Sequence, residues 1–521
     1  MRDRDRQRCA WRVGAAFPLL TSLACGSGNS EPPSKPDATA GAGDARTIGT
    51  HREAGDVSTA SDGRRDSRTD GRTVKRPPDA ALPSADAATP GLTKVATGEY
   101  ETFYLVDGVI WAYGAVPENF GLGSFQGIAV PPMKVLTPAG LTFLDVQGGL
   151  HQSMALDVNH RVWTWGVAAL SGSATPATID TTMPYMITQD NTGATFDDVI
   201  AIEPTTSFDA ALKSDGTVWV WGDCSGGVLG AGVADAGATV DAPTQVPIPL
   251  PTGVTITKIS GAVAMLALAS DGGVWAWGFA EGGVLGTGDT TDCNVPRQVM
   301  GLPGDIVDIV AGGGDWFLAL TSSGELYGWG YRNPYLGIPG YAPVEMPISL
   351  TSSLHLKKPV VAVAADSLTT HVILSDGTLW AWGDASNGGI GDGQEPNWVP
   401  TGCGWDFMTY DLMVYAPVQI APSVSNFTKL FANSAYDFYD YALTASGDLY
   451  SWGRNKTATL GNGVVPLAPN GNSGTAADIA AYHPNSWDVP LATRVTPFTT
   501  PLTGVLSPCC PDGKPDASGC M

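Results

Sequence analysis

A short aromatic motif that recurs seven times is the feature that most limits how this chain can fold. Each copy is a strand-like run of alternating aromatic or apolar residues, usually Trp-x-Trp, that ends in glycine. The closing glycines stand at positions 114, 166, 222, 278, 330, 383 and 453, with spacings of 52, 56, 56, 52, 53 and 70 residues. A recurring period of this kind indicates a repeat architecture in which each copy is one small structural unit.

Each copy has the pattern of a four-stranded, hairpin-rich unit. In the fourth copy, the apolar stretch Leu266–Leu268 precedes the turn Ser270-Asp271-Gly272, and the aromatic strand follows. Asp-Gly between two apolar runs is a strong hairpin signal, because glycine adopts a positive φ without steric cost. A glycine-rich loop and a proline-containing segment, Pro296–Val299, complete the copy. We expect about four short strands per copy and no sustained helix.

The seven copies must cover one another's faces, because a single four-stranded sheet cannot bury both of its own. Radial closure of the seven units achieves this and leaves few open strand edges. We therefore predict an all-β chain with one seven-bladed β-propeller of four-stranded blades over residues 92–500. The two aromatic rings of each motif point to the same face of the strand. We expect them to fill the gaps between blades rather than to stack on ligands.

The motifs resemble the regulator of chromosome condensation repeat. Residues 149–156 are similar to the first half of that repeat, G-x-x-H-S-x-A-L, and residues 214–230 to its second half, S-D-G-x-V-W-A-W-G with a following G-Q-L-G. The resemblance covers about residues 92–500 and implies a seven-bladed propeller. It implies function less firmly, because the founding member exchanges guanine nucleotide on a small GTPase and docks on chromatin, whereas other members are protein-binding platforms. A secreted bacterial inhibitor of β-lactamase with this propeller type acts by surface contact alone.

The N-terminus has the pattern of an export signal over residues 1–24. Five arginines precede an apolar stretch from Val13 to Ala24, which is too short to span a bilayer. Leu23-Ala24-Cys25 resembles a bacterial lipobox, in which Cys25 becomes the lipidated first residue, although Ser22 stands where Leu is common. Ordinary cleavage after Ser22-Leu23-Ala24 is the alternative. We predict an exported, bacterial cell-envelope or surface lipoprotein with a membrane contact only through Cys25, and otherwise a secreted protein.

Two segments flank the repeats and differ from them in composition. Residues 25–91 are rich in Ala, Asp, Pro, Ser, Thr, Gly and Arg with almost no large apolar residue, so we predict a disordered tether. Residues 501–521 form a C-terminal tail with three cysteines.

The net charge of −23 excludes several classes of partner. Residues 92–521 hold 14 Lys and Arg against 39 Asp and Glu, so the repeats carry most of the acidity. Nucleic acid requires a basic footprint, and an anionic membrane surface repels an acidic one. We therefore expect no nucleic-acid partner and no docking of the folded part on lipid.

The sequence contains no recognisable catalytic or cofactor motif. A phosphate-binding loop, a G-x-S-x-G elbow and metal-ligand spacings are all absent. We expect no enzyme, no cofactor and no metal site. One alternative stays open: carboxylates that meet in the propeller channel could form an acid–base pair, which would appear as clustered acids with raised pKa values.

Candidate binding and disulfide residues lie in loops. The insertion at 393–417 carries five aromatic side chains, which are enriched at interfaces, although they could equally fold back onto the ring: Trp398, Trp405, Phe407, Tyr410 and Tyr415. A second run, Tyr436–Tyr441, is a weaker candidate because half of a strand there must point inward. Six cysteines remain besides Cys9 and Cys25, and we predict a disulfide between Cys224 and Cys293, which lie in loops of adjacent blades.

Taken together, these features predict an exported, lipid-anchored, non-catalytic propeller that binds a protein or a cell-surface polymer through its loops. We expect a monomer. The alternative, from the family resemblance alone, is a regulator of a small GTPase that resembles a guanine-nucleotide exchange factor.

Overall fold

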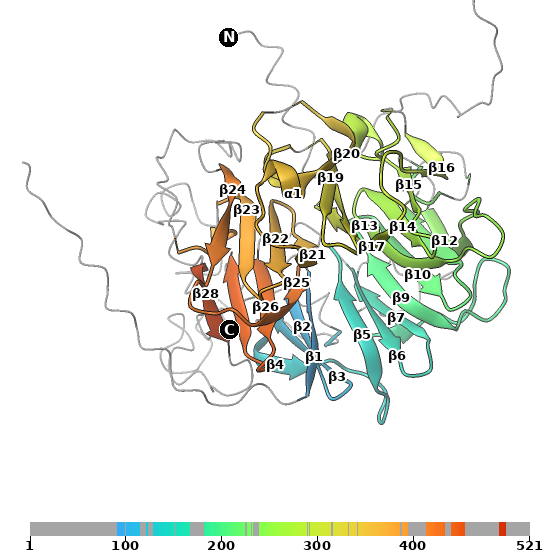
Figure 1. Ribbon diagram of the computed structural model, residues 1–521. Helices are drawn as coiled ribbons and strands as arrows, with labels where there is room; N and C mark the ends of the chain where they lie inside the picture. Colours follow the sequence, from blue (N-terminus) through green and yellow to red (C-terminus); the bar gives the residue numbers. More distant parts are fainter. Residues whose placement is uncertain are drawn as a thin grey trace, which may run out of the picture. The chain divides into compact units, whose positions relative to one another are not determined.

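The computed structural model confirms the seven-bladed β-propeller (Figure 1). The structure describes residues 91–98, 101–114, 121–122, 129–150, 152–166, 182–223, 227–230, 232, 239–288, 290, 292–313, 316–331, 333–340, 342–385, 388–393, 413–432, 439–453 and 489–495. Each blade is one antiparallel sheet of four strands that are consecutive in the chain and adjacent in the sheet. No strand is shared between blades in this part of the chain, so side-chain packing must close the ring.

The strands of blades 1 to 4 are β1 (Leu92–Thr97), β2 (Glu101–Val106), β3 (Val109–Gly114), β4 (Ala129–Lys134); β5 (Phe143–Gly148), β6 (Gln152–Asp157), β7 (Val162–Gly166), β8 (Tyr185–Met186); β9 (Val199–Pro204), β10 (Phe208–Lys213), β11 (Val218–Asp223), β12 (Thr239–Gln245); β13 (Ile256–Gly261), β14 (Ala264–Ala269), β15 (Val274–Gly278) and β16 (Cys293–Gln298). Those of blades 5 to 7 are β17 (Ile306–Gly312), β18 (Trp316–Thr321), β19 (Leu326–Gly330), β20 (Val344–Ser349); β21 (Val360–Ala365), β22 (Thr369–Leu374), β23 (Leu379–Asp384), β24 (Met413–Ile420); β25 (Phe427–Phe431), β26 (Tyr439–Thr444), β27 (Leu449–Gly453) and β28 (Val489–Val495). The described helices are short: η4 (Glu281–Gly283), η5 (Asn333–Leu336) and α1 (Leu350–Ser353).

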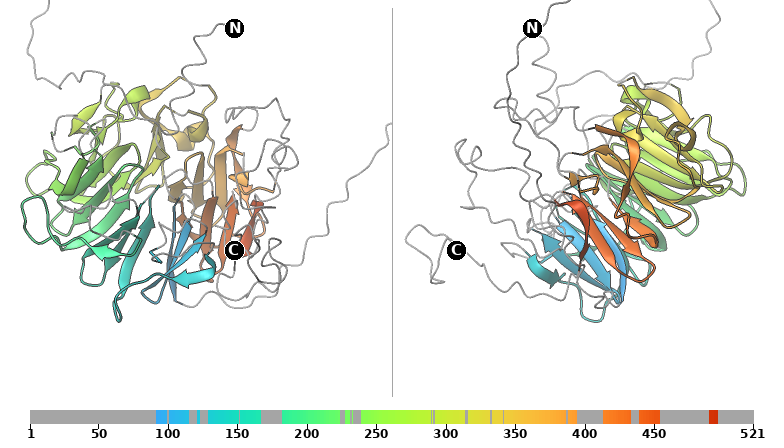
Figure 2. Two further views of the ribbon diagram at one scale, coloured as in Figure 1. Left: turned by 180° about the vertical axis from the view of Figure 1, so that it is seen from behind. Right: turned by 60° about the vertical axis from the view of Figure 1, so that its left-hand side comes forward.

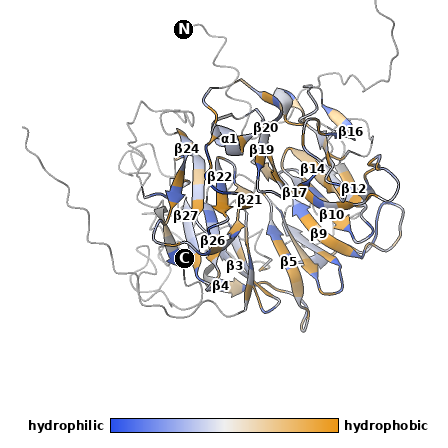
Figure 3. Cartoon of the chain, in the orientation of Figure 1, coloured by the Kyte–Doolittle hydropathy of each residue, from blue (hydrophilic) through white to orange (hydrophobic). Residues whose placement is uncertain are grey.

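The first strand of every blade lies at the centre of the ring. Consecutive first strands contact one another from β1 to β5 and onward, and β25 contacts β1 to complete the circle. Figure 2 shows the same radial order of blades from behind. Hydrophobic residues run through the strands of all seven blades (Figure 3) and form seven buried clusters. The core of the ring is therefore divided among the blades and their interfaces.

The closing glycine of each aromatic motif has a steric reason. All seven adopt a positive φ, between 101° and 135°, where other residues are strained. At Gly383 a Cβ atom would lie 2.4 Å from the carbonyl oxygen of Leu368. At Gly222 it would lie 2.7 Å from the Cα atom of Phe208. The glycine thus allows the third strand to pass close to the start of the second strand.

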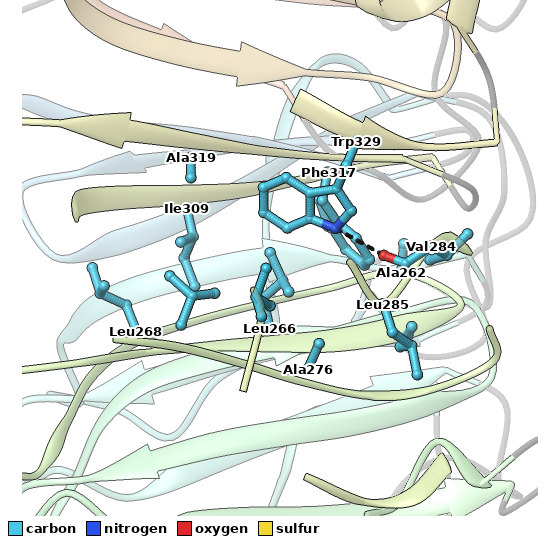
Figure 4. Packing of buried hydrophobic residues seen from close by; sticks show 14 of the residues in the cluster. Ala262, Leu266, Leu268, Ala276, Val284, Leu285, Ile309, Phe317, Ala319 and Trp329 are labelled. Carbon is cyan, nitrogen blue, oxygen red and sulfur yellow. Dashed lines mark hydrogen bonds between the residues drawn. The ribbon is translucent and has the colours of Figure 1, made fainter. Parts of the chain in front are cut away.

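The second tryptophan of the aromatic motif packs on the preceding blade, as the sequence predicted. Trp329 of blade 5 lies in the cluster of blade 4, and its Nε1 donates to the carbonyl oxygen of Val284 at 3.0 Å (Figure 4). Trp277 of blade 4 donates in the same way to Val228 of blade 3. A Cβ atom on Gly230 would lie 2.4 Å from the Trp277 ring. This explains the glycine of the pairs Leu229-Gly230 and Leu285-Gly286 in the loops after the third and fourth motifs.

The two rings of a motif differ in burial. Trp221 and Trp277 are completely buried, whereas Trp219 and Trp275 are only partly buried. Trp219 packs edge-on against Phe196, and its Nε1 donates to Thr217 Oγ1 at 2.9 Å. The second position therefore carries most of the packing between blades.

Tyrosines rather than tryptophans close the ring between blades 7 and 1. The Tyr439 hydroxyl lies 2.6 Å and 2.7 Å from the carbonyl oxygens of Gly98 and Glu101. The hydroxyls of Tyr104 and Tyr441 are 3.3 Å apart, and all three tyrosines are buried. The aromatic run at 436–441 was a weak candidate for binding, but its described part, Tyr439–Tyr441, belongs to this seam.

We predict that Trp277→Ala lowers the free energy of unfolding by about 3–5 kcal/mol, because it removes a buried ring and leaves a cavity between blades. Trp275→Ala is the matched control two residues away on the same face, and its loss should be clearly smaller because that ring is partly exposed. Urea unfolding of both variants measures the difference. Equal losses would contradict the assignment of the second ring to the interblade contact.

Candidate functional site

Few of the residues singled out from the sequence lie within the described part of the chain. Cys25, Cys224, Trp398, Trp405, Phe407 and Tyr410 fall outside it, as does His151 of the repeat motif. Cys293 is buried in the cluster between blades 4 and 5, with its Sγ 3.0 Å from the carbonyl oxygen of Val295. Its pairing with Cys224 stays a prediction. Tyr415 belongs to the outer strand β24 and is half-buried, so the loop ends earlier than the sequence suggested.

One end of the ring is built by the turns between the second and third strands. In each blade, an amide of this turn donates to the carbonyl of the residue just before the first strand. The seven donors and acceptors are Asp107 to Gly91, Val158 to Thr142, Ser214 to Asp198, Ser270 to Thr255, Ser322 to Asp305, Ser375 to Pro359 and Ala445 to Asn426. The hairpin turns and the starts of the innermost strands therefore lie on one face, which we call the turn face.

The turn face also links neighbouring blades through the backbone. The Phe143 amide of blade 2 donates to the carbonyl of Gly108 in the turn of blade 1. The amides of Val360 and Phe427 bond in the same way to Gly324 and Gly377. At these junctions the bonds tie the start of one first strand to the turn of the preceding blade.

A β-bulge at the second residue of every first strand presents a side chain at this face. The pairing register between first and second strands shifts there in all seven blades. We call the seven bulged residues the bulge ring: Thr93, Leu144, Ile200, Thr257, Val307, Val361 and Thr428. All are exposed, and the four aliphatic members are 49%, 44%, 55% and 56% exposed in chain order. Bulges commonly re-aim a side chain at functional surfaces.

Exposed acids surround the bulge ring. We call six of them the acidic rim, because they lie in the hairpin turns or directly before the first strands: Asp107, Asp198, Asp215, Asp271, Asp305 and Asp376. Asp215 and Asp376 each accept hydrogen bonds from the amide and hydroxyl of the threonine two residues on. Hydrogen bonds from Thr378 hold the pKa of Asp376 below its ordinary value, so this carboxylate is ionised at neutral pH.

The next layer of the innermost strands carries ion pairs between blades. Lys94 of β1 pairs with Asp145 of β5, and Lys258 of β13 pairs with Asp308 of β17. Glu203 lies between them on β9 and accepts a hydrogen bond from the Gly261 amide at 2.9 Å. Burial raises the pKa of Glu203 to about 7, against the lowering effects of this amide, Lys258 and Lys94.

Fully buried polar groups lie away from this layer, where the second strands begin. Gln152 of blade 2 reaches blade 3 and donates to the Thr205 carbonyl at 2.9 Å and to Asp209 Oδ1 at 3.1 Å. Burial raises the pKa of Asp209 to about 8, although hydrogen bonds from Gln152 and Trp221 lower it. Burial likewise raises the pKa of Asp366 to about 7.

A buried histidine links blades 6 and 7. Trp452 Nε1 lies 3.1 Å from both His371 Nε2 and the carbonyl oxygen of Gly389, which is itself 3.2 Å from His371 Nε2. His371 Nδ1 faces Asp440 Oδ2 at 3.6 Å. Burial lowers the pKa of His371 to about 3, so the ring is neutral. The histidine and both neighbouring side chains are buried from solvent. This group therefore has the chemistry of an interblade polar contact rather than of an open site.

Some carboxyl groups have raised pKa values, as the acid–base hypothesis requires, but among the described residues they do not form an accessible pair. Three carboxyls have raised pKa values, and Asp209 and Asp366 of these are completely buried at blade interfaces. Glu203 alone lies on a first strand.

The described residues also contain no group of three His, Cys, Asp or Glu side chains arranged for a metal ion. Within the same residues, no helix has the length and apolarity to cross a membrane.

We predict that Asp209→Asn changes the pH dependence of stability. The unfolded carboxyl ionises near its ordinary pKa of 3.8 and the folded one near 8, so wild-type stability from this group falls as pH rises between these values. Asparagine cannot ionise, so the stability of the variant relative to wild type should increase across that window. Urea unfolding at several pH values measures this difference.

Asp215→Asn is the matched control for this experiment. The hydrogen bonds of Thr217 keep the pKa of Asp215 below its ordinary value, so its contribution changes only at more acidic pH. A constant difference between Asp209→Asn and wild type across the window would show that Asp209 is ionised in the folded protein.

Comparisons with known proteins agree with this architecture. The model of the regulator of chromosome condensation (RCC1) repeat matches residues 271–320, which run from the turn of blade 4 to the second strand of blade 5. The chain is 32% identical over 260 residues to the E3 ubiquitin-protein ligase HERC2 of Homo sapiens and 30% identical over 260 residues to the mitochondrial RCC1 domain-containing protein RUG3 of Arabidopsis thaliana. These alignments cover 49% of this chain but only 5% of the first protein and 54% of the second.

Solved structures show the same fold at lower identity. Prp20p from Saccharomyces cerevisiae superimposes with a TM-score of 0.56 at 20% identity, covering 77% of this chain and 87% of that one. Human WBSCR16 gives a TM-score of 0.54 at 18% identity, covering 66% and 86%. These similarities show that the chain has the seven-bladed propeller fold of these structures and that residues 271–320 carry a regulator of chromosome condensation repeat.

Proposed function

We propose that this chain is a non-catalytic propeller that binds a protein through the turn face of its ring. The bulge ring is the observation that carries this proposal. Four aliphatic side chains at equivalent positions, each about half exposed, are unfavourable in water unless a partner covers them. A hydrophilic cell-surface polymer would gain little from such side chains, so a protein is favoured over a polymer.

The distribution of ionisable groups supports a role without catalysis. A general acid or base must reach a substrate, whereas Asp209, Asp366 and His371 are completely buried, and only Glu203 on β9 combines a raised pKa with partial exposure. The ion pairs Lys94–Asp145 and Lys258–Asp308 join neighbouring blades and so have a structural role. The proposal therefore assigns these groups to the stability of the ring.

The proposal also places the protein outside the cytoplasm, held on a membrane by a lipid on Cys25. Its support is the sequence pattern alone: the basic start, the short apolar stretch and Leu23-Ala24-Cys25. Residues 26–91 then connect the lipid-bearing cysteine to the ring along the chain. The alternative, regulation of a small GTPase, requires a cytoplasmic ring, so localisation separates the two functions.

We predict that the full-length chain, used as bait, recovers a specific protein from the cell-envelope fraction of its own host. An unrelated protein of similar negative charge is the control bait, because it captures partners that bind through charge alone. Recovery of cytoplasmic GTPases as the only specific partners would replace this proposal with the exchange-factor function.

We predict that Cys25→Ser abolishes incorporation of a fatty-acid label and releases the protein from the membrane fraction. Serine has nearly the same size but cannot form the thioether that carries the lipid. Cys9→Ser is the control, because that cysteine precedes the expected cleavage point. Cleavage without labelling in the wild-type protein would indicate ordinary secretion instead.

A further inference from the structure

We infer that the turn face binds a cationic protein surface with an apolar centre, such as an amphipathic segment rich in Lys or Arg. The bulge ring would contact its apolar side chains, and the acidic rim would pair with its basic ones. This inference rests on the proposed function and names the chemistry of its partner.

Four exposed aliphatic side chains share one structural position. Other exposed apolar side chains are scattered over outer strands and loops, such as Met346 and Ile348 on β20, and Val158 lies in the turn of blade 2. The aliphatic members of the bulge ring instead recur at the same point of the innermost strand in blades 2, 3, 5 and 6. First strands of consecutive blades contact one another, so these members lie around one centre. A single apolar feature of a partner can therefore reach several of them.

The charge around this centre is negative. Six exposed aspartates form the acidic rim, and the exposed basic side chains beside them are Lys357 and Lys358, before β21. The partly buried Lys213 also lies near Asp215 and helps to lower its pKa. Lys358 lies 3.9 Å from Asp376 and offsets part of that charge. His160, in the turn of blade 2, is also exposed. The rim thus retains an excess of negative charge.

Basic residues of the innermost strands change the net negative charge of the turn face only a little. Lys94 and Lys258 are engaged by Asp145 and Asp308. Lys429 is exposed on β25, one residue after Thr428 of the bulge ring. One further positive charge leaves the face acidic, so it favours a cationic partner and repels phosphate-rich surfaces.

The experiment measures binding of the full-length protein to three designed peptides. The first is an amphipathic Leu/Lys peptide, the second a Leu/Glu peptide of the same pattern, and the third a Ser/Lys peptide that keeps the charge but lacks the apolar face. We expect the Leu/Lys peptide to bind at least about tenfold more tightly than either of the others, and more weakly as salt increases.

Two sets of variants test the two halves of the surface. Val307→Ser with Val361→Ser should weaken Leu/Lys binding by about tenfold, because both apolar contacts are lost. Asp215→Asn with Asp271→Asn should weaken it and reduce its salt dependence. The matched control is Met346→Ser with Ile348→Ser, which removes two similarly exposed side chains from an outer strand. Thermal unfolding verifies that every variant keeps its fold.

The outcomes separate this inference from the proposed function. Wild-type affinity in the Val307/Val361 variant, or equal binding of the Leu/Glu peptide, would overturn the inference. A partner captured from the envelope that binds this variant as tightly as wild type would overturn it too, while leaving the proposed function intact. Failure to capture any specific partner, with peptide binding that depends on the bulge ring, would remove the proposed function and keep the surface.

Discussion

The contact between an indole ring and a glycine-bearing loop of the preceding blade is the interaction on which the ring depends. Trp277 and Trp329 show its form: the ring is buried, its Nε1 donates to a loop carbonyl, and a glycine of the same loop lies against the ring. Because a Cβ atom at Gly230 or Gly286 would lie within 3 Å of the indole, loop and ring are complementary. Each blade is therefore positioned by its neighbour rather than by a shared sheet.

At the seam between blades 7 and 1, tyrosines rather than tryptophans join the two neighbouring blades. Tyr113 occupies the place of the second tryptophan in blade 1, and Tyr439 donates to the backbone of that blade. A tyrosine brings a hydroxyl that can bond to a carbonyl at the far end of an apolar ring. The first and last blades are thus joined by apolar packing and by hydrogen bonds whose geometry fixes their relative position. The circle is complete without an exchange of strands between them.

The sequence predicts the architecture well because its signals are local and repeated. Asp-Gly turns, alternating aromatics and closing glycines define three of the four strands, and their recurrence gives the number of blades. The bulge ring could not be predicted, because a bulge arises from the register between two strands. Val307 and Val361 fit an ordinary buried strand equally well by residue type. The contact of Gln152 with Asp209 also lacks a local signal, since 57 residues separate its partners.

The two kinds of carboxyl in this protein have different physical roles. Acids such as Asp209 and Asp366 lie between blades, where burial favours their neutral form and hydrogen bonds fix their orientation. Asp215 and Asp376 of the rim lie in turns, where hydrogen bonds from Thr217 and Thr378 favour the charged form. The bulge ring lies beside the charged group, and its members are exposed rather than part of the buried clusters between blades. Under the proposed function, substitutions there would alter binding at the turn face without loosening the contacts between indole and loop.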